Sequence, residues 1–321
     1  DFIGNYAENT EGTDIYGGAI YNRGTITSIT GSFTDNELKR DTYVSGNAYG
    51  GAIYNTGTIT SIDADFTGNS VEGAVNVRHG GAISNAGTIN SVSGTFTNNI
   101  AGAGGAIYNE SAMTVRNALF DGNFACNFGG AIFNTNNLSI YDSVFTDNSS
   151  YNLGGAIRNS GVLNIFAQNA DTVFSSNSAT IQSVYSDINN VGTLNLNAGL
   201  GREILFGGTV TGTNVVINVG NDTSIAGGRV VFGNEVSGNT INLKNNGAIL
   251  LSKSVNGVAL GQYDEIPQDV TSIAYGSLNV VGLTNDANNG FIDARNNNTG
   301  DTINLGAVTL NSDLNIGVDA N

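Results

Sequence analysis

The sequence predicts an all-β protein, a right-handed, single-stranded parallel β-helix of roughly twelve coils, and three observations favour this fold. The tetrapeptide Gly-Gly-Ala-Ile occurs six times, and a second motif, Phe-x-x-Asn, alternates with it. The first Gly lies 16 residues before the next Phe in five units, whereas the return from Phe to Gly-Gly varies from 8 to 17 residues. Short runs alternate apolar and polar residues, which is the period of strands. A fixed arc joined to an arc of variable length is typical of a solenoid.

The two motifs define the elements of each coil. The Gly-Gly-Ala-Ile copies begin at Gly17, Gly50, Gly80, Gly104, Gly129 and Gly154. The Phe-x-x-Asn copies begin at Phe2, Phe33, Phe66, Phe96, Phe120, Phe145 and Phe174. Between them, Leu138 and Ile140 flank Ser139, and Leu163 and Ile165 flank Asn164, so each fixed arc predicts short strands. Stacked coils would pair these strands in parallel, each coil adding about 4.8 Å along the axis.

Asparagine recurs at two fixed places in the coil. One column follows Gly-Gly-Ala-Ile, and it consists of Asn22, Asn55, Asn85, Asn109, Asn134 and Asn159. The other ends Phe-x-x-Asn, and it consists of Asn36, Asn69, Asn99, Asn123, Asn148 and Asn177. A stacked amide can donate to one neighbour and accept from the other, and Asn tolerates the left-handed conformation of a turn. We therefore interpret both columns as structural ladders at coil corners and not as ligand sites.

The coils are not identical. The first three place an apolar residue one step later than the others, at Ile29, Ile62 and Val92, which predicts a bulge or altered turn there. Tyr185-Ser-Asp-Ile stands where a seventh Gly-Gly-Ala-Ile would fall. We therefore divide the chain into residues 1–190, with these repeats and loops of variable length, and residues 191–321, a continuation with a second, less regular repeat. Late strands are expected at 278–281, 303–305, 308–310 and 314–316, and a loop at 262–268.

Composition narrows the possible partners. The formal net charge is −16, with 11 basic and 27 acidic residues, and the three lysines are dispersed. Such a surface repels nucleic-acid phosphates and anionic membranes. We therefore expect no nucleic-acid binding. No apolar run approaches the roughly 20 residues that span a bilayer, so we also expect no direct membrane insertion of this fragment. The single cysteine, Cys126, excludes an internal disulfide framework. The chain starts and stops in mid-pattern, from which we expect further sequence on both sides.

The paired motifs resemble the repeats of the polymorphic outer-membrane proteins of chlamydiae and similar bacterial autotransporters, over residues 1 to about 190. Residues 191–321 are similar to the membrane-proximal part of autotransporter passengers. The resemblance implies a passenger domain displayed outside the bacterial cell and anchored in the outer membrane by the full-length protein. It also implies an adhesin, with the two motifs as the matching positions, although we interpret their role as mainly architectural.

The residues favour no enzyme, cofactor or metal site. Paired carboxylates for acid–base chemistry stand about 5–9.5 Å apart, and Asp63 and Asp65 could meet that distance. The matching residues one coil later are Ser93 and Thr95, so no acidic groove continues. His79 has no partner nearby in sequence, and we interpret it as a turn residue. A calcium loop at 221–223 or 286–289 would lack the usual number of ligands.

One surface stripe could bear on binding. The residue between Ile and Asn of each motif should point outward, and in this column Tyr21, Tyr54, Tyr108 and Phe133 are aromatic, with Ser84 and Arg158 completing it. Such a stripe could stack sugar rings or partner side chains, or it could only stabilise the sheet. The variable loops 37–49 and 70–78 are further candidates. We expect an adhesin or self-association module that contacts a host or neighbouring-cell surface protein or glycan, or itself. The alternatives are a passive spacer, filament or surface-layer subunit and, last, a polysaccharide-active enzyme.

Overall fold

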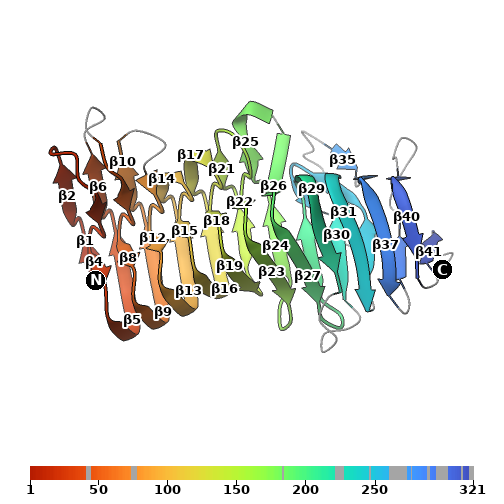
Figure 1. Cartoon of the computed structure of the whole chain (residues 1–321), viewed down its shortest axis with the longest axis horizontal. Helices are drawn as coiled ribbons and strands as arrows, with labels where there is room; N and C mark the ends of the chain where they lie inside the picture. The colour runs from red at the N-terminus through yellow and green to blue at the C-terminus, as the bar shows by residue number, and fades with distance from the viewer. Residues whose placement is uncertain are drawn as a thin grey trace.

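The computed structural model confirms the parallel β-helix, with coils stacked from the N-terminal to the C-terminal end (Figure 1). It describes residues 1–40, 45–73, 78–182, 184–220, 228–245, 247–259, 273–275, 277–287, 290–293, 303–311 and 314–317. The expected loop at 262–268 and the candidate calcium ligands at 221–223 lie outside these residues. Within them, no helix is long and apolar enough to cross a membrane.

Four series of strands build the coils. The series after Gly-Gly comprises β4 (Ile20–Asn22), β8 (Ile53–Asn55), β12 (Ile83–Asn85), β15 (Ile107–Asn109), β18 (Ile132–Asn134), β22 (Ile157–Asn159), β26 (Val184–Asn190), β29 (Thr209–Val219), β31 (Glu235–Asn245), β36 (Ser277–Asn279) and β39 (Ile303–Asn304). The series in the fixed arc comprises β5 (Thr25–Thr34), β9 (Thr58–Thr67), β13 (Thr88–Thr97), β16 (Ala112–Asp121), β19 (Asn137–Tyr141), β23 (Val162–Ala167), β27 (Thr193–Ala198), β37 (Gly282–Ala287) and β40 (Ala307–Leu310). β29 and β31 are long enough to serve both series.

The Phe column forms the third series. It comprises β1 (Phe2–Ile3), the ends of β5, β9, β13 and β16, and then β20 (Val144–Thr146), β24 (Thr172–Ser175), β28 (Glu203–Phe206), β30 (Arg229–Phe232), β32 (Ala248–Leu251), β38 (Gly290–Asp293) and β41 (Leu314–Gly317). Within the described residues this series has twelve stacked strands, paired in parallel throughout. The strands expected near 278, 303, 308 and 314 are present as β36, β39, β40 and β41.

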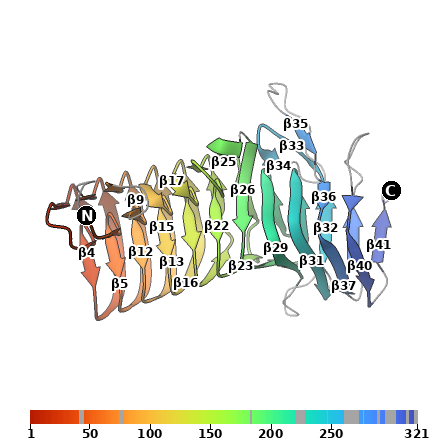
Figure 2. The ribbon, with the colours of Figure 1, turned by 45° about the horizontal axis from the view of Figure 1, so that its top comes forward.

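The fourth series lies in the variable arc. It comprises β2 (Tyr6–Asn9), β6 (Glu37–Arg40), β10 (Ser70–Glu72), β14 (Ile100–Ala103), β17 (Phe124–Phe128), β21 (Ser149–Ser150) and β25 (Ser178–Ala179), with β3 (Ile15–Tyr16), β7 (Ala48–Tyr49) and β11 (Arg78–His79) before the Gly-Gly turns. After β25 comes a short 3₁₀ turn, η2 (Thr180–Gln182). The strands β33 (Lys253–Val255), β34 (Val258–Ala259) and β35 (Ile273–Tyr275) leave the coil, pair antiparallel and stand at its upper edge in Figure 2.

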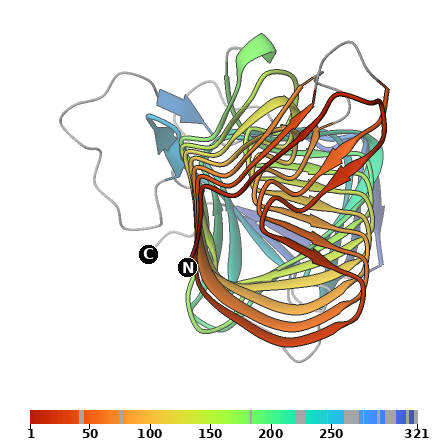
Figure 3. The ribbon, with the colours of Figure 1, turned by 90° about the vertical axis from the view of Figure 1, so that its left-hand side faces the viewer.

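A long, thin core runs along the axis, inside the superimposed coils of Figure 3, and a small second cluster of Leu38, Ala48, Val71 and Ala101 lies in the variable arc. Phenylalanines form the most regular column of the long core, and the ring centroids of Phe33, Phe66, Phe96 and Phe120 lie 4.7–4.8 Å apart in nearly parallel planes. This distance equals the spacing of paired strands, so each ring stacks on the ring of the next coil. All four side chains are fully buried. The stacking therefore favours the same residue at the same place in neighbouring coils, and it ends where Phe232 pairs with Leu251.

The difference between the first three coils and the later ones is a bulge, as expected. Where β13 meets β16, Ile89 pairs with Met113, Val92 with Val115, and Gly94 with Ala118. The third coil therefore has one extra residue before Val92, and the fourth has one extra after Val115. In the seventh coil, Ile188 pairs with Ile157, so the degraded motif keeps its predicted place.

Candidate binding surface

The four residues of the Gly-Gly-Ala-Ile motif have structural roles in the coil. Gly50 has φ of +72°, and a Cβ there would lie 2.0 Å from the carbonyl oxygen of Ile53. At Gly51 a Cβ would lie 2.1 Å from the carbonyl oxygen of Gly81 in the next coil. Ala52 and Ile53 are fully buried. The first glycine is thus required by the turn and the second by the close stacking of coils, and in this copy neither Ala nor Ile reaches solvent.

The twelve predicted ladder asparagines form two continuous chains of hydrogen bonds. In one, the side-chain amide of Asn55 donates to Oδ1 of Asn85 at 2.8 Å, and each member repeats this toward the C-terminus as far as Asn190. In the other, Asn123 donates to Oδ1 of Asn148 at 2.9 Å and to the carbonyl oxygen of Phe96 at 2.8 Å. The asparagine side chains of both ladders are buried, so the ladders offer no surface to a ligand.

The second ladder ends on a carboxylate, which sequence reasoning missed. Nδ2 of Asn177 donates to Oδ1 of Asp187 at 2.9 Å, and the backbone N–H of Gly208 donates to Oδ2 at 2.7 Å. Asp187 is fully buried, and burial raises its pKa to about 7, although the hydrogen bonds oppose the shift. The available signal in the sequence was that Asp187, in Tyr-Ser-Asp-Ile, stands where the Gly-Gly-Ala-Ile motif has Ala. Asp187 closes the ladder where the first repeat type ends.

The predicted aromatic stripe lies largely under other aromatic rings. The exposed fraction of Tyr21 is 44%, but that of Tyr54 is 8% and that of Tyr108 is 9%, while Phe133 is half-buried. A second column from the strands before Gly-Gly packs against the stripe. Its contacts are Tyr16 with Tyr21 at 5.1 Å, Tyr16 with Tyr54 at 4.9 Å, Tyr49 with Tyr54 at 5.1 Å, His79 with Tyr108 at 4.4 Å, and Phe128 with Phe133 at 6.1 Å between ring centroids. We call these two columns the aromatic seam.

The aromatic seam contains the only histidine of the chain. His79 stacks on Tyr49 at 5.0 Å, and burial lowers its pKa to about 4. Among the described residues, its Nδ1 and the hydroxyl of Ser84 have no hydrogen-bond partner. Burial also raises the pKa of Tyr49 to about 12. Within the described residues, Nδ1 of this imidazole therefore has no hydrogen-bonded partner that would orient it for catalysis.

The other candidate site residues from the sequence do not come together in one site among the described residues. Oδ1 of Asp63 accepts from Ser93 at 2.9 Å, and Oδ1 of Asp65 accepts from the Thr95 hydroxyl at 2.7 Å, so both carboxylates bind the next coil. Cys126 is half-buried on β17. Among the described residues, no group of three or more His, Cys, Asp or Glu could hold a metal ion. Residues 41–44 and 74–77 of the two candidate loops lie outside the described residues.

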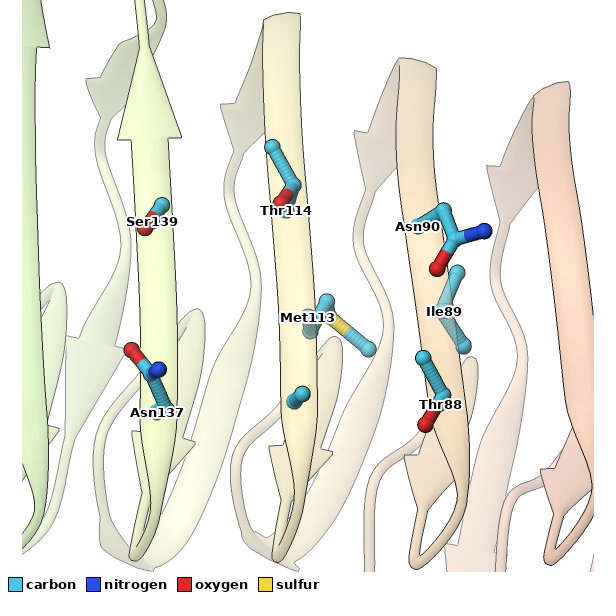
Figure 4. A pocket seen from close by; sticks show the side chains of 8 residues that line it. Thr88, Ile89, Asn90, Met113, Thr114, Asn137 and Ser139 are labelled. Atoms are coloured by element: carbon cyan, nitrogen blue, oxygen red, sulfur yellow. The ribbon is translucent and has the colours of Figure 1, made fainter.

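A polar hollow lies on the outer face of the fixed arc (Figure 4). It spans β13, β16 and β19, has a volume of about 160 Å³, and is lined by Thr88, Ile89, Asn90, Ala112, Met113, Thr114, Asn137 and Ser139. The outward residues at the matching place in the flanking coils are Thr88 and Asn137, whereas the middle coil has Ala112. The walls are formed mainly by hydroxyl and amide side chains, together with the apolar side chains of Ile89 and Met113.

A cation lies beside the hollow on the same face. Arg116 follows Thr114 by two residues on β16, and its Cζ lies 3.8 Å from the ring centroid of Tyr141. The Tyr141 ring stacks in turn on Phe166, with centroids 4.4 Å apart and planes within 6°. The guanidinium is exposed, while both rings are half-buried. The stack therefore holds a positive charge in one place on a strongly acidic protein.

A third amide column also escaped the sequence analysis. Asn195 donates to Asn164 at 2.7 Å, Asn218 to Asn195 at 2.7 Å, and Asn242 to Asn218 at 3.2 Å. It runs along the outer face and donates toward the N-terminus, opposite to the two internal ladders. The recurring triplets with Asn between two apolar residues, at 163–165, 194–196, 217–219 and 241–243, were the signal.

The Chlamydia polymorphic membrane protein repeat matches three consecutive segments, residues 93–110, 117–135 and 142–160. Each segment contains one Phe-x-x-Asn copy followed by one Gly-Gly-Ala-Ile copy, beginning at Phe96, Phe120 and Phe145. The resemblance expected from the two motifs is thus confirmed, and these coils are repeats of this type. No curated protein and no solved structure matches the chain.

Proposed function

We propose that this stack of polymorphic membrane protein repeats is part of a passenger displayed outside the cell, where it acts as an adhesin or a self-association module. The observation that carries the proposal is the match of three consecutive coils to a repeat named for a membrane protein. The physical support is that the ladders and the Phe column fill the interior, so that only outward side chains are left to make contacts. Rigid outward positions favour binding because little conformational entropy is lost on association.

The test is binding of the purified chain, as a function of concentration, to mammalian cells, to mucin and to itself on a surface. Saturable binding to any of the three supports the proposal. Circular dichroism under the same conditions checks that the rod is folded. A folded rod that binds none of them would overturn the proposal and favour a passive spacer.

A spacer is the second candidate, because the regular internal columns continue from coil to coil. Phe2 to Phe232 form one stack in which neighbouring ring centroids lie 4.6–5.4 Å apart. A rod of this kind holds its ends apart whatever its surface carries. A spacer should tolerate substitutions on every outward face, whereas an adhesin should lose binding when one face is changed.

A further inference from the structure

We propose that the hollow and Arg116 together form a binding site for a sugar ring that carries an anionic group, a carboxylate or a sulfate. The ring would occupy the hollow between β13, β16 and β19, and the anionic group would reach the guanidinium. This inference rests on the proposed function, because it names the class of ligand that the outer face of the fixed arc would recognise.

The size of the hollow limits the ligand. About 160 Å³ is roughly half the smallest volume usual for a drug-sized site, which starts near 300 Å³. The hollow is also open to solvent on a strand face, so a polymer can pass over it with one unit inserted. One ring of a glycan chain fits these two conditions, whereas a folded partner domain would need a much wider surface.

The lining fits the hydroxyls of a sugar. Each sugar hydroxyl both donates and accepts, and so do the hydroxyls of Thr88 and Thr114 and the side-chain amide of Asn90. Within the described residues, these three side chains make no hydrogen bond, so they are available to a ligand. On the far wall, Oδ1 of Asn137 and the hydroxyl of Ser139 accept only long hydrogen bonds from Asn164, at 3.4 and 3.3 Å. Figure 4 shows these side chains on three adjacent strands.

The position of Arg116 selects the anionic group. Thr114 and Arg116 point to the same face, two residues apart, which is about 7 Å along a strand. A substituent on a ring in the hollow can span that distance. The Cζ of Arg116 lies 3.8 Å from the Tyr141 ring centroid, and among the described residues Arg116 makes no ion pair. A planar guanidinium in this state can bind a carboxylate or sulfate with two parallel hydrogen bonds.

The experiment measures binding of fluorescent tetrasaccharides to the full 321-residue chain by fluorescence polarisation. The probes are a hyaluronan tetrasaccharide, which carries carboxylates, a heparin tetrasaccharide, which also carries sulfates, and neutral chitotetraose. We expect saturable binding of at least one acidic probe and at least tenfold weaker binding of chitotetraose. Because both acidic probes carry carboxylates, stronger binding of the heparin probe assigns the anionic group to a sulfate, whereas binding of hyaluronan at least as strong assigns it to a carboxylate.

Two variants test the two halves of the site separately. Ala112→Asn fills the hollow with the residue that the next coil has at this place, and Arg116→Gln removes the charge while keeping a polar side chain. Each should weaken binding of the acidic probe at least tenfold, as expected for a lost charge-assisted contact or a blocked site. Arg23→Gln, at another exposed arginine, is the matched control and should change nothing.

The outcomes separate this inference from the proposed function. If all variants bind the acidic probes as the unchanged chain does, or if no probe binds, the inference is overturned, and saturable binding to cells would leave the adhesin proposal standing. If the chain binds an acidic probe through Ala112 and Arg116 but binds no cells, mucin or itself, the site stands and the adhesin proposal fails. Unchanged circular dichroism of each variant shows that losses come from the site and not from unfolding.

Discussion

The middle of the second ladder should be the most sensitive polar position of the rod. Asn123 is fully buried, and its side chain makes four hydrogen bonds: it donates to Asn148 and Phe96 and accepts from both the side chain and the backbone N–H of Asn99. Asn123→Ala leaves the N–H of Asn99 buried without this acceptor, which costs about 1–3 kcal/mol. The other lost bonds add about 1 kcal/mol each. We expect the free energy of unfolding to fall by about 4–6 kcal/mol.

Guanidinium chloride unfolding followed by circular dichroism measures this loss, with Asn90→Ala as the matched control. Asn90 is an exposed asparagine on the third coil, and its replacement should change the free energy by less than about 0.5 kcal/mol. Hydrogen exchange should also show faster exchange at the amide of Asn99. A loss no larger than that of the control would refute the argument that the ladder stabilises the rod.

Three further predictions follow from single positions. Gly57→Ala should destabilise by about 1–3 kcal/mol because its Cβ would lie 2.1 Å from the carbonyl oxygen of Gly24, whereas Gly24→Ala, with no atom within 4 Å, should be tolerated in the same denaturation assay. The pKa of Asp187 is raised from 3.8 to about 7, so the folded state binds its proton more tightly, and stability relative to Asp187→Asn should fall as the pH rises from about 4 to about 7. The pKa of His79 is lowered from 6.5 to about 4, so stability relative to His79→Phe should be lost as the pH falls from about 6.5 to about 4. Denaturation at several pH values checks both, and equal slopes for variant and unchanged chain would contradict them.

The fold was predictable because the interior allows little variation. A side chain in an inner column contacts the same residue one coil above and one below, at the strand spacing, so a change at one coil disturbs both neighbours. Phe33 and Phe66, or Asn55 and Asn85, therefore recur with the repeat and can be aligned from the sequence alone. The bulge was predictable for the same reason, since Val92 stands one step out of line.

The aromatic seam was only half visible in the sequence. The column after Gly-Gly was recognised, but its partner column before Gly-Gly lies at the end of the variable arc, where loop lengths differ. Tyr16, Tyr49, His79 and Phe128 each stand directly before the first Gly of a motif, and that shared position was the available signal. The alternation of a strand shows only that a side chain points away from the core. It does not show whether another strand covers that side chain, and at Tyr54 the side chain is covered.

The same reasoning places specific recognition where the coils differ. An inner column repeats because every coil must match its neighbours, so it carries no information that distinguishes one part of the rod from another. An outward column has no such requirement, and Ala112 stands between Thr88 and Asn137 in the lining of the hollow. Arg116 likewise stands in a column that continues with Tyr141 and Phe166. In a stacked protein, a break in an outward column is therefore the first place to look for a ligand.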